Sequence, residues 1–303
     1  MVDRETVAES FKTIQDEICS SLEECDGKAK FSEDNWKREA GGGGRTRIIQ
    51  HGDVFEKGGV LFSAVEGELP PLMKRHFKVE EANFFATGVS IVIHPSHPMV
   101  PIIHMNIRYF EMEQPGGKVT RWFGGGIDLT PHYIDKDDAA YFHKELKRVC
   151  DEYDLAYYPR FKKWADDYFY LSHREETRGV GGIFFDHLEP DESKSAEDLF
   201  EFVKAVGRLF APSYLEIVNR KRKVSFDDRH KEWQKLRRGR YVEFNLIHDR
   251  GTKFGLETKG RTESILMSLP ETAGWVYNYQ AEKGSEEEAT LNLLKKDIDW
   301  LNL

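Results

Sequence analysis

The chain has 303 residues, of which 39% are hydrophobic, and its 53 acidic and 44 basic side chains give a formal net charge of −9. This is enough apolar material for the core of one large domain or two small ones. A net negative chain repels nucleic acid and anionic membranes, so neither is expected as a partner, although a local group of arginines can still bind an anionic substrate.

The sequence also disfavours a membrane-spanning or an extracellular protein. No stretch approaches 18 consecutive apolar residues, and the N-terminal segment has neither the apolar core of a signal peptide nor the arginine-rich composition of an organelle presequence. The three cysteines, Cys19, Cys25 and Cys150, are too few and too scattered for a disulfide framework or a zinc cage. We therefore expect a cytoplasmic protein without a membrane span.

The first half of the chain predicts one helix followed by strands. The helix is expected to begin after Asp3, because apolar residues recur at three- and four-residue steps from Val7 to Leu22. The glycine run at 41–44 is a candidate hinge. Strands are expected within 45–67, with a hairpin candidate at Lys57-Gly58-Gly59, in two parts of 87–112 and over 119–129.

Helices dominate the second half, where apolar residues again follow a helical period. Pro212 is expected to open a new helix toward Arg220, and Ser285 with Glu288 forms a capping box before the C-terminal helix. The other expected helices are 138–153, 160–174 and 195–210, and the expected strands are 181–188, 239–250 and 262–270.

The predicted strands are mostly joined by short turns or lie in pairs, without regular alternation of strand and helix. This organisation predicts an α+β fold in which a large, mostly antiparallel β-sheet is sandwiched between layers of α-helices. The chain has no repeats and no long linker. We expect a single domain over 1–303, in which 1–35 forms the N-terminal helix and its connection.

The segment TGVSIVIHPSHPMVPIIHMNIRYFEM (87–112) places polar side chains on apolar strands. Side chains alternate between the faces of a strand, so Ser90 shares a face with His94, and His104 shares one with Asn106 and Arg108. Prolines predict a turn between the two runs, and a hairpin can bring the five residues together. Two alternatives are open: an ordinary half-solvated sheet, or a face that binds an anion.

Three junctions of basic residues and glycine could join this face. They are RWFGGGID, which ends at Asp128, the turn RGVGG, which begins at Arg178, and Lys259-Gly260-Arg261. Each alone could be a solvated loop. Together they indicate a ligand with several carboxylates, because guanidinium groups bind carboxylates bidentately.

The familiar cofactor motifs are missing, because the chain has no dinucleotide-binding turn, no Walker sequence, and no H-E-x-x-H or C-x-x-C motif. Histidines could still hold a metal. His94 and His104 can face each other, His143 and His173 lie on neighbouring predicted helices, and Asp128 could complete an iron site of two histidines and one carboxylate. The alternative is that the helical histidines are surface or capping groups.

Four segments make the chain resemble the oxygen-dependent coproporphyrinogen III oxidases of haem biosynthesis. They are VIHPSHPMVPIIHMNIRYFE, WFGGGIDLTPHY, YPRFKKWADDYFYLSHREETRGVGGIFFD and RRGRYVEFNLIHDRGTKFGLETKGRTESILMSLP. The resemblance implies oxidative decarboxylation of two propionates of coproporphyrinogen III to vinyl groups. Molecular oxygen is the implied electron acceptor, and protoporphyrinogen IX, CO2 and hydrogen peroxide are the products. It also implies a homodimer without an organic cofactor.

The same resemblance implies the site residues. His104 corresponds to the family's proposed proton donor, Asp128 to the acid of its GGG-x-DLTP motif, and Arg178 to a functional arginine. The segment 241–276 corresponds to its dimerisation region. The implied substrate-binding residues are Ser90, Asn106, Ile107, Arg108, Lys259, Gly260 and Arg261, and Lys259 departs from the family's usual pattern. A divalent metal at His94, His104, His143 and His173 is implied for some members only, and the sequence leaves both alternatives open.

These residues suggest a mechanism. We expect Asp128 to contact the pyrrole N–H groups and help remove a proton, and His104 to transfer protons. The reacting carboxylate would be bound by Arg108, Arg178 or Arg261. Two other classes remain open, a metal-dependent oxygenase that uses the histidines and a non-catalytic tetrapyrrole carrier.

Overall fold

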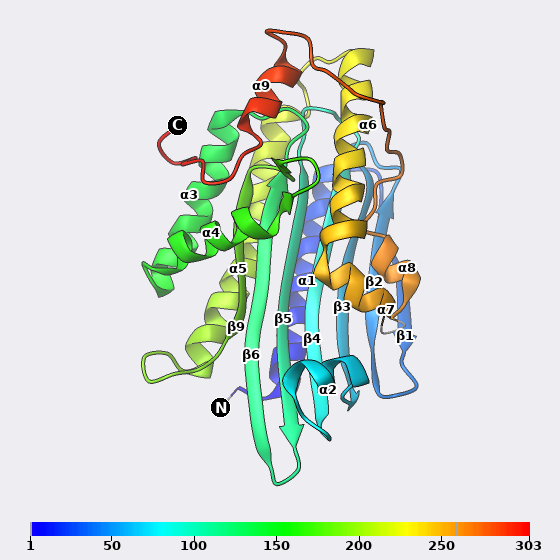
Figure 1. Cartoon of the computed structure of the whole chain (residues 1–303). Helices are drawn as coiled ribbons and strands as arrows, with labels where there is room; N and C mark the ends of the chain where they lie inside the picture. The colour runs from blue at the N-terminus through cyan, green and yellow to red at the C-terminus, as the bar shows by residue number, and fades with distance from the viewer. Residues whose placement is uncertain (1, 258–259) are drawn as a thin grey trace.

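The computed structural model, which describes residues 2–257 and 260–303, is built on one large sheet (Figure 1). The sheet has seven strands in the order β1-β2-β3-β4-β5-β6-β9, and each neighbouring pair is antiparallel. The strands are β1 (Ser32–Lys37), β2 (Gly42–Gln50), β3 (Phe55–Glu68), β4 (Asn83–Pro95), β5 (Ile102–Gln114), β6 (Lys118–Thr130) and β9 (Gly181–Leu188). A small second sheet pairs β7 (Tyr170–Leu171) with β8 (Glu176–Thr177).

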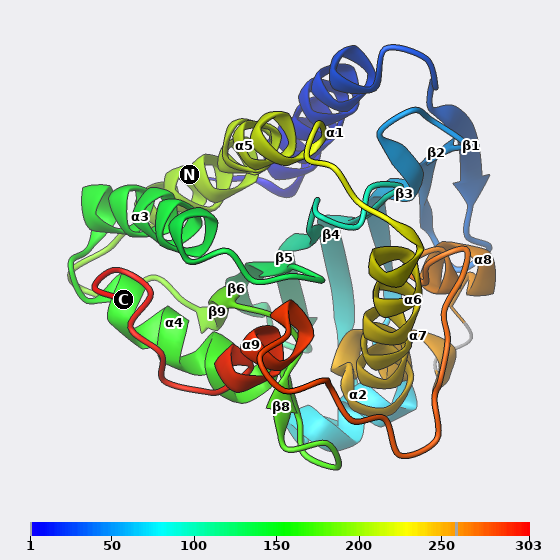
Figure 2. The same ribbon diagram turned by 90° about the horizontal axis from the view of Figure 1, so that it is seen from above.

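Helices cover both faces of the large sheet, as the view from above shows (Figure 2). One face packs against α1 (Arg4–Asp26), α3 (Lys136–Tyr153) and α5 (Ala196–Lys221). Over the other face lie α2 (Pro71–Phe77), α6 (Asp228–Glu243), the π-helical turn η1 (Phe244–His248), α7 (Arg250–Glu257) and α8 (Thr262–Leu266). The remaining helices are α4 (Tyr157–Tyr168), which packs beside β9, and α9 (Glu286–Leu293). None of the helices in the described ranges is long and apolar enough to cross a membrane.

The main core lies between the sheet and the layer of α1, α3 and α5. Asp3 caps α1 by accepting a hydrogen bond from the Thr6 N–H at 2.7 Å, and the apolar stripe of this helix is buried. The odd-numbered residues in the central parts of β4 and β5, from Val89 to Ile93 and from Ile103 to Ile107, point into this core and are fully buried. The even-numbered residues therefore point to the opposite face, beneath α6 and α7.

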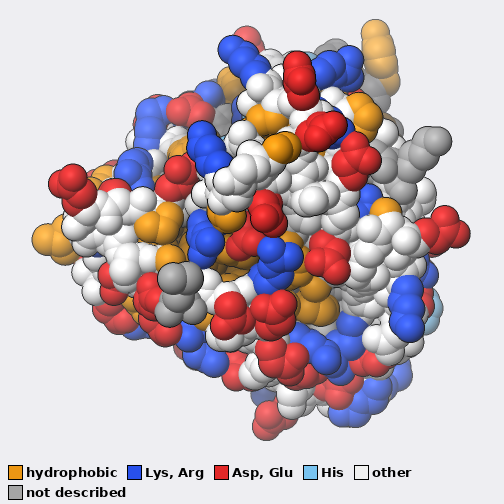
Figure 3. Space-filling model, turned by 90° about the horizontal axis from the view of Figure 1, so that it is seen from below, with side chains coloured by type: hydrophobic (Ala, Val, Ile, Leu, Met, Phe, Trp, Pro, Cys, Tyr) orange, Lys and Arg blue, Asp and Glu red, His pale blue; other side chains and the backbone are white. Residues whose placement is uncertain are grey.

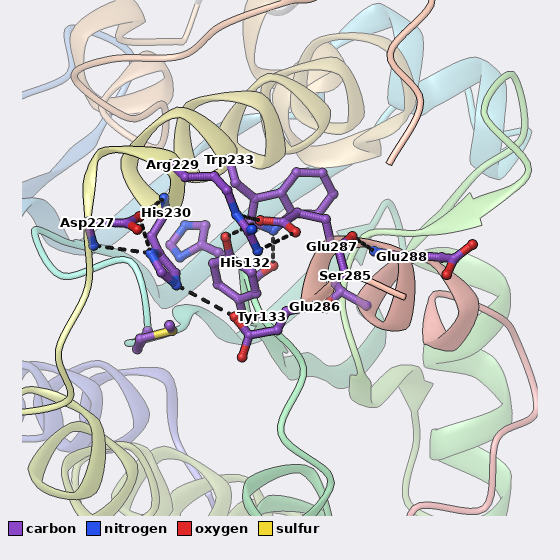
Figure 4. A network of polar contacts seen from close by, with 12 residues as sticks. His132, Tyr133, Asp227, Arg229, His230, Trp233, Ser285, Glu286, Glu287 and Glu288 are labelled. Atoms are coloured by element: carbon purple, nitrogen blue, oxygen red, sulfur yellow. Dashed lines mark hydrogen bonds and ion pairs between the residues drawn. The ribbon is translucent and has the colours of Figure 1, made fainter. Parts of the chain in front are cut away.

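The N-terminal end of α6 is tied to α9 by a buried carboxylate (Figure 4). Glu287 accepts hydrogen bonds from Arg229 Nε and Nη2 at 3.1 and 3.0 Å, and from the Tyr133 hydroxyl at 2.7 Å. Tyr133 follows β6, so the network joins three parts of the chain that are distant in sequence. The network therefore holds α6 in place, and the other end of α6 reaches the polar face of the sheet.

The α+β class, the antiparallel sheet and the helix predicted over 138–153 are confirmed. The strands predicted over 239–250 and 262–270 are wrong, because these segments contain the end of α6, η1 and α8. Tyrosine, valine and phenylalanine favour strands, but the buried Tyr241, Phe244 and Asn245 recur at helical spacing. Packing of this helical face therefore outweighs the local strand preference.

The predicted hairpin is also wrong, whereas the candidate hinge at 41–44 stays a prediction. Lys57-Gly58-Gly59 lies inside β3, where a β-carbon on Gly59 would lie 1.9 Å from the methyl carbon of Met267. This glycine thus lets the end of α8 approach the sheet closely, rather than forming a turn. The glycines at 42–44 belong to β2 and pair with β1 and β3.

Two helix boundaries differ from prediction. Pro212 lies inside α5, which continues to Lys221 because residues on both sides of the proline, including Phe210 and Tyr214, are buried in the core. The helix expected over 160–174 ends at Tyr168. His173 therefore lies in a turn beyond α4.

Candidate active site

The polar face predicted for 87–112 is present on β4 and β5. Ser90 pairs across the strands with Asn106, and His104 pairs with Asp128 of β6, so all four side chains share one face. Arg108 follows on the same side of β5. Apart from Asp128, these residues are partly exposed. The hairpin therefore brings the expected donors together on the face opposite the core.

His104 and Asp128 form a hydrogen-bonded pair. His104 Nδ1 lies 2.8 Å from Asp128 Oδ1, and the side chain of Asp128 is only 1% exposed. An ionised carboxylate can only accept a hydrogen bond, so Nδ1 carries the proton and donates it. Within the described part of the chain, His104 Nε2 has no hydrogen-bond partner, and 20% of this side chain is exposed. Nε2 is therefore the atom at which this pair can exchange a proton with a ligand.

Arg178 lies behind the pair and neutralises its carboxylate. Its Nη2 donates to Asp128 Oδ1 at 2.6 Å and its Nε to Oδ2 at 3.2 Å. Burial alone would raise the pKa of Asp128, but Arg178 and His104 together hold it below its ordinary value. Asp128 therefore stays ionised and keeps His104 in one orientation.

Aromatic rings enclose the guanidinium group of Arg178, which is 2% exposed. The rings of Phe169, Tyr241 and Phe244 lie 4.5, 4.7 and 4.6 Å from its central carbon. The remaining nitrogen, Nη1, donates to Asn245 Oδ1 at 3.0 Å. Arg178 thus has its partners inside the protein.

These buried positions change two of the expected roles. Arg178 was expected among the groups that bind the reacting carboxylate, but its nitrogens are occupied by Asp128 and Asn245. Asp128 was expected to contact pyrrole N–H groups, but its Oδ1 accepts from His104 and Arg178 and its Oδ2 accepts from Arg178. In this arrangement, His104 is the member of the group that faces outward.

Arg108 presents a cation on the more open part of the same face. Its Nη1 donates to Asn106 Oδ1 at 2.8 Å, and its Nη2 lies 3.0 Å from Asp186 Oδ1 on β9. About a third of the side chain, 34%, remains exposed. A guanidinium group held in this way is preorganised to bind a carboxylate.

The glycine motif makes room for Arg108. Gly124 pairs with Arg108 across β5 and β6, and a β-carbon there would lie 2.5 Å from Asp186 Oδ1 and 2.7 Å from Arg108 Nε. Any larger residue at this position would displace the arginine. Ile107 points the other way, and its fully buried side chain lies against Gly207 of α5. Only the backbone of Ile107 can therefore face a ligand on the polar face.

The structure does not bring Arg261 of the predicted Lys-Gly-Arg group to this face. Lys259 lies outside the described residues, and Gly260 is exposed. Arg261 forms an ion pair with Asp34 of β1, the edge strand at the opposite end of the sheet from β9. Its contacts therefore separate it from Arg108.

The four histidines considered as metal ligands lie in different surroundings. His94 is fully buried and hydrogen-bonds to the backbone after α8, and His143 is buried on the core side. His173 pairs with Glu243 at 2.8 Å. Residues 2–257 and 260–303 contain no group of three or more His, Cys, Asp or Glu side chains arranged to hold a metal ion. The predicted set with His104 does not fit a metal site.

Sequence reasoning missed Asp186 and Asn245. A signal for Asp186 was available, because strand parity places it on the same face as Gly182, which pairs with Asp128. Asn245 was hidden by the prediction of a strand over 239–250. Helical spacing from Tyr241 would have placed it on the buried side.

The molecule is hollowed at one end, as the space-filling view from below shows (Figure 3). Hydrophobic side chains are visible inside the hollow, and acidic and basic side chains surround it. Such a surface suits a ligand with an apolar body and charged edges.

A histidine oriented by a buried carboxylate, on the same sheet face as a preorganised arginine, defines an acid–base enzyme site for an anionic substrate. Comparison with known proteins identifies the family, because residues 6–300 match the model of coproporphyrinogen III oxidase. The chain belongs to the coproporphyrinogen III oxidase family, as its motifs predicted.

Two relatives illustrate the similarity. The chain is 51% identical over 298 residues to the oxygen-dependent coproporphyrinogen-III oxidase of Drosophila melanogaster, an alignment that covers 95% of this chain and 76% of the relative. It is 46% identical over 301 residues to coproporphyrinogen-III oxidase 1, chloroplastic, of Arabidopsis thaliana, with 96% and 77% covered. The relatives are thus similar across nearly the whole of this chain.

Proposed function

We propose that the protein is an oxidoreductase of haem biosynthesis that converts two propionate groups of coproporphyrinogen III to vinyl groups with O2 as the electron acceptor. Family membership supports the reaction. The observation that carries its assignment to this site is the His104–Asp128 pair on the same sheet face as the preorganised Arg108. A substrate with four propionates requires both an anion-binding group and a group that moves protons.

The reaction of each propionate breaks two bonds. The bond to the carboxylate breaks, and its electron pair forms the new C=C bond as CO2 leaves. One C–H bond breaks at the carbon attached to the pyrrole, and its two electrons pass to O2. That hydrogen leaves as a proton, which together with one proton from solvent converts the reduced oxygen to hydrogen peroxide. Two propionates thus consume two O2 and yield two CO2 and two H2O2.

Different side chains of the site bind the substrate and transfer protons. Arg108 binds a propionate carboxylate and sets the position of the tetrapyrrole, with Ser90 and Asn106 beside it. His104 exchanges protons at Nε2. Asp128, held by Arg178, keeps His104 Nδ1 protonated and the ring in one orientation.

The test is turnover by the purified protein. Coproporphyrinogen III is incubated with it in air and under argon, and CO2, O2 uptake and the divinyl product are measured. We expect one O2 consumed for each CO2 released in air and no reaction under argon. Folded protein that releases no CO2 in air would overturn the proposal.

Two controls distinguish the other classes. Loss of turnover after dialysis against a strong chelator, with recovery on addition of one divalent metal, would indicate a metal-dependent oxygenase. Tight binding of the tetrapyrrole without O2 uptake would indicate a carrier. We expect chelator treatment to leave turnover unchanged, since the histidines lie in separate surroundings.

We also propose a homodimer that uses the segment 241–276. Large apolar side chains in this segment are between 43% and 56% exposed, namely Leu246, Ile247, Leu256, Trp275 and Val276. Size-exclusion chromatography with light scattering should give twice the chain mass of 35.2 kDa. Ile247→Glu should shift the protein toward the monomer, whereas Leu155→Glu, at an exposed position outside the segment, should not. A monomer in the unmodified protein would contradict this assignment.

The proposed location is the cytoplasm. The acidic composition and the absence of a membrane-crossing helix from the described residues are compatible with it. Fractionation of the source cells, followed by immunodetection, tests it, and recovery in an organelle fraction would contradict it.

A further inference from the structure

Among the described residues, the side chain of Arg178 donates hydrogen bonds to two residues only, Asp128 and Asn245. Asn245 lies in η1, directly after α6, and the residue is 4% exposed. Arg178 Nη1 donates to Asn245 Oδ1 at 3.0 Å, while Nε and Nη2 both donate to Asp128. The amide thus takes the one nitrogen of the guanidinium group that Asp128 does not bind.

The orientation of the Asn245 amide is fixed by its two neighbours. Arginine can only donate, so the oxygen of the amide must face Arg178. The amide nitrogen lies 3.5 Å from the Ser268 hydroxyl, whose own proton is directed to the Ile265 carbonyl at 2.9 Å. Asn245 therefore joins the segment after α8 to Arg178.

Because aromatic rings enclose it, the guanidinium group of Arg178 depends on these polar contacts for its orientation. Phe169, Tyr241 and Phe244 surround the guanidinium group, and an aromatic ring attracts a cation without selecting which nitrogen points where. Hydrogen bonds supply that selection. Without Asn245, small changes in the side-chain torsion angles of Arg178 can tilt the guanidinium group and weaken one of its two bonds to Asp128.

We propose that Asn245 is a positioning residue for the oxidase reaction, which acts by orienting Arg178 and, through it, the Asp128–His104 pair. The proposal rests on the proposed function, because the reaction is where the orientation of His104 matters. Asn245 is buried and its amide oxygen faces Arg178, so in this arrangement it is not among the residues presented to a substrate. It therefore affects the rate of the chemical step and not substrate binding.

The experiment is a double-mutant cycle with Asn245→Leu and Arg178→Lys. Leucine resembles asparagine in size and lacks the acceptor, and lysine keeps the buried charge without the fork that bridges two partners. For Asn245→Leu we expect kcat to fall by about tenfold or more with KM within about twofold, because small displacements of a catalytic group are costly. In the Arg178→Lys background, the same substitution should lower kcat by less than about twofold, since its target is gone.

The control is Asn219→Leu, at an exposed position on α5, which should leave kcat and KM unchanged. Circular dichroism and thermal unfolding show which variants are folded. If Arg178→Lys does not fold, the single variant Asn245→Asp is measured in place of the double variant. It keeps the acceptor, so it should retain more of kcat than Asn245→Leu.

Two results would overturn the proposal. One is an Asn245→Leu variant with wild-type kcat, and the other is a loss that is equally large with and without the arginine, which would indicate a general structural role. Absence of turnover in the unmodified protein would instead contradict the proposed function, so the two failures are distinguishable.

Discussion

Replacing Asp128 by asparagine tests the buried acid–base group directly. The substitution keeps the shape of the side chain and removes its charge. Arg178, which is 2% exposed, would then be a buried cation without a counter-charge. The new amide nitrogen would also face either His104 Nδ1 or the guanidinium group, and both of these are donors.

The expected loss of stability is large. Removing one partner of a buried ion pair costs about 3–5 kcal/mol, because the other charge stays buried and unpaired. Turnover should also fall, since His104 loses the acceptor that orients it, and general acid–base catalysis contributes about 100- to 10,000-fold. Stability and kcat should therefore fall together.

Urea unfolding and turnover measure the two effects. Asp53→Asn is the matched control, because Asp53 forms an exposed pair with Lys28 at 3.0 Å and its loss should cost less than about 1 kcal/mol. Adding Arg178→Met to Asp128→Asn should recover stability, since both buried charges are then gone, but should not recover turnover. An Asp128→Asn variant with wild-type stability and kcat would refute this reasoning.

Three further substitutions test the arginine on the open face and the buried histidine on the core side. Gly124→Ala should raise KM by about tenfold or more, because the new methyl group displaces Arg108 and weakens a charge-assisted hydrogen bond; Gly274→Ala, where the nearest atom would be 3.4 Å away, should not. Arg108→Lys should also raise KM, measured in the same steady-state assay, because an ammonium group cannot replace the fork, and an unchanged KM would contradict its role in binding. Burial lowers the pKa of His143 from 6.5 to about 4, so between these two pH values the unfolded chain takes up a proton that the folded chain does not. Urea unfolding should therefore show that the folding equilibrium constant of the wild type, relative to that of His143→Gln, falls by about tenfold for each unit by which the pH is lowered from 6.5 toward 4. An identical pH dependence of stability in the two proteins would exclude the effect.

Strand parity predicted the polar face of the sheet well. The alternation in 87–112 placed Ser90, His104, Asn106 and Arg108 on one face, and the register of β4 and β5 has them there. This works because side chains alternate strictly along a strand, so one buried face determines the other. The glycine-rich junction had already singled out Asp128, and the register places it opposite His104.

Contacts between distant segments were beyond such reasoning. The burial of Arg178 depends on Phe169, which follows α4, and on Tyr241 and Phe244, which lie in the distant segment of α6 and η1. The strand preference of 239–250 concealed two of these contacts. Arg261 illustrates the same limit, since its motif indicated a substrate contact and its partner in the structure is Asp34.

A crystal structure of the protein with bound coproporphyrin, the stable oxidised form of the proposed substrate, tests the central claim most directly. We predict that the tetrapyrrole lies on the polar face of β4, β5 and β6, with one propionate within hydrogen-bond distance of Arg108 and with His104 Nε2 facing the ligand. Asp128 and Arg178 should remain paired behind it. A tetrapyrrole bound elsewhere, with Arg108 and His104 free of contact, would contradict the account.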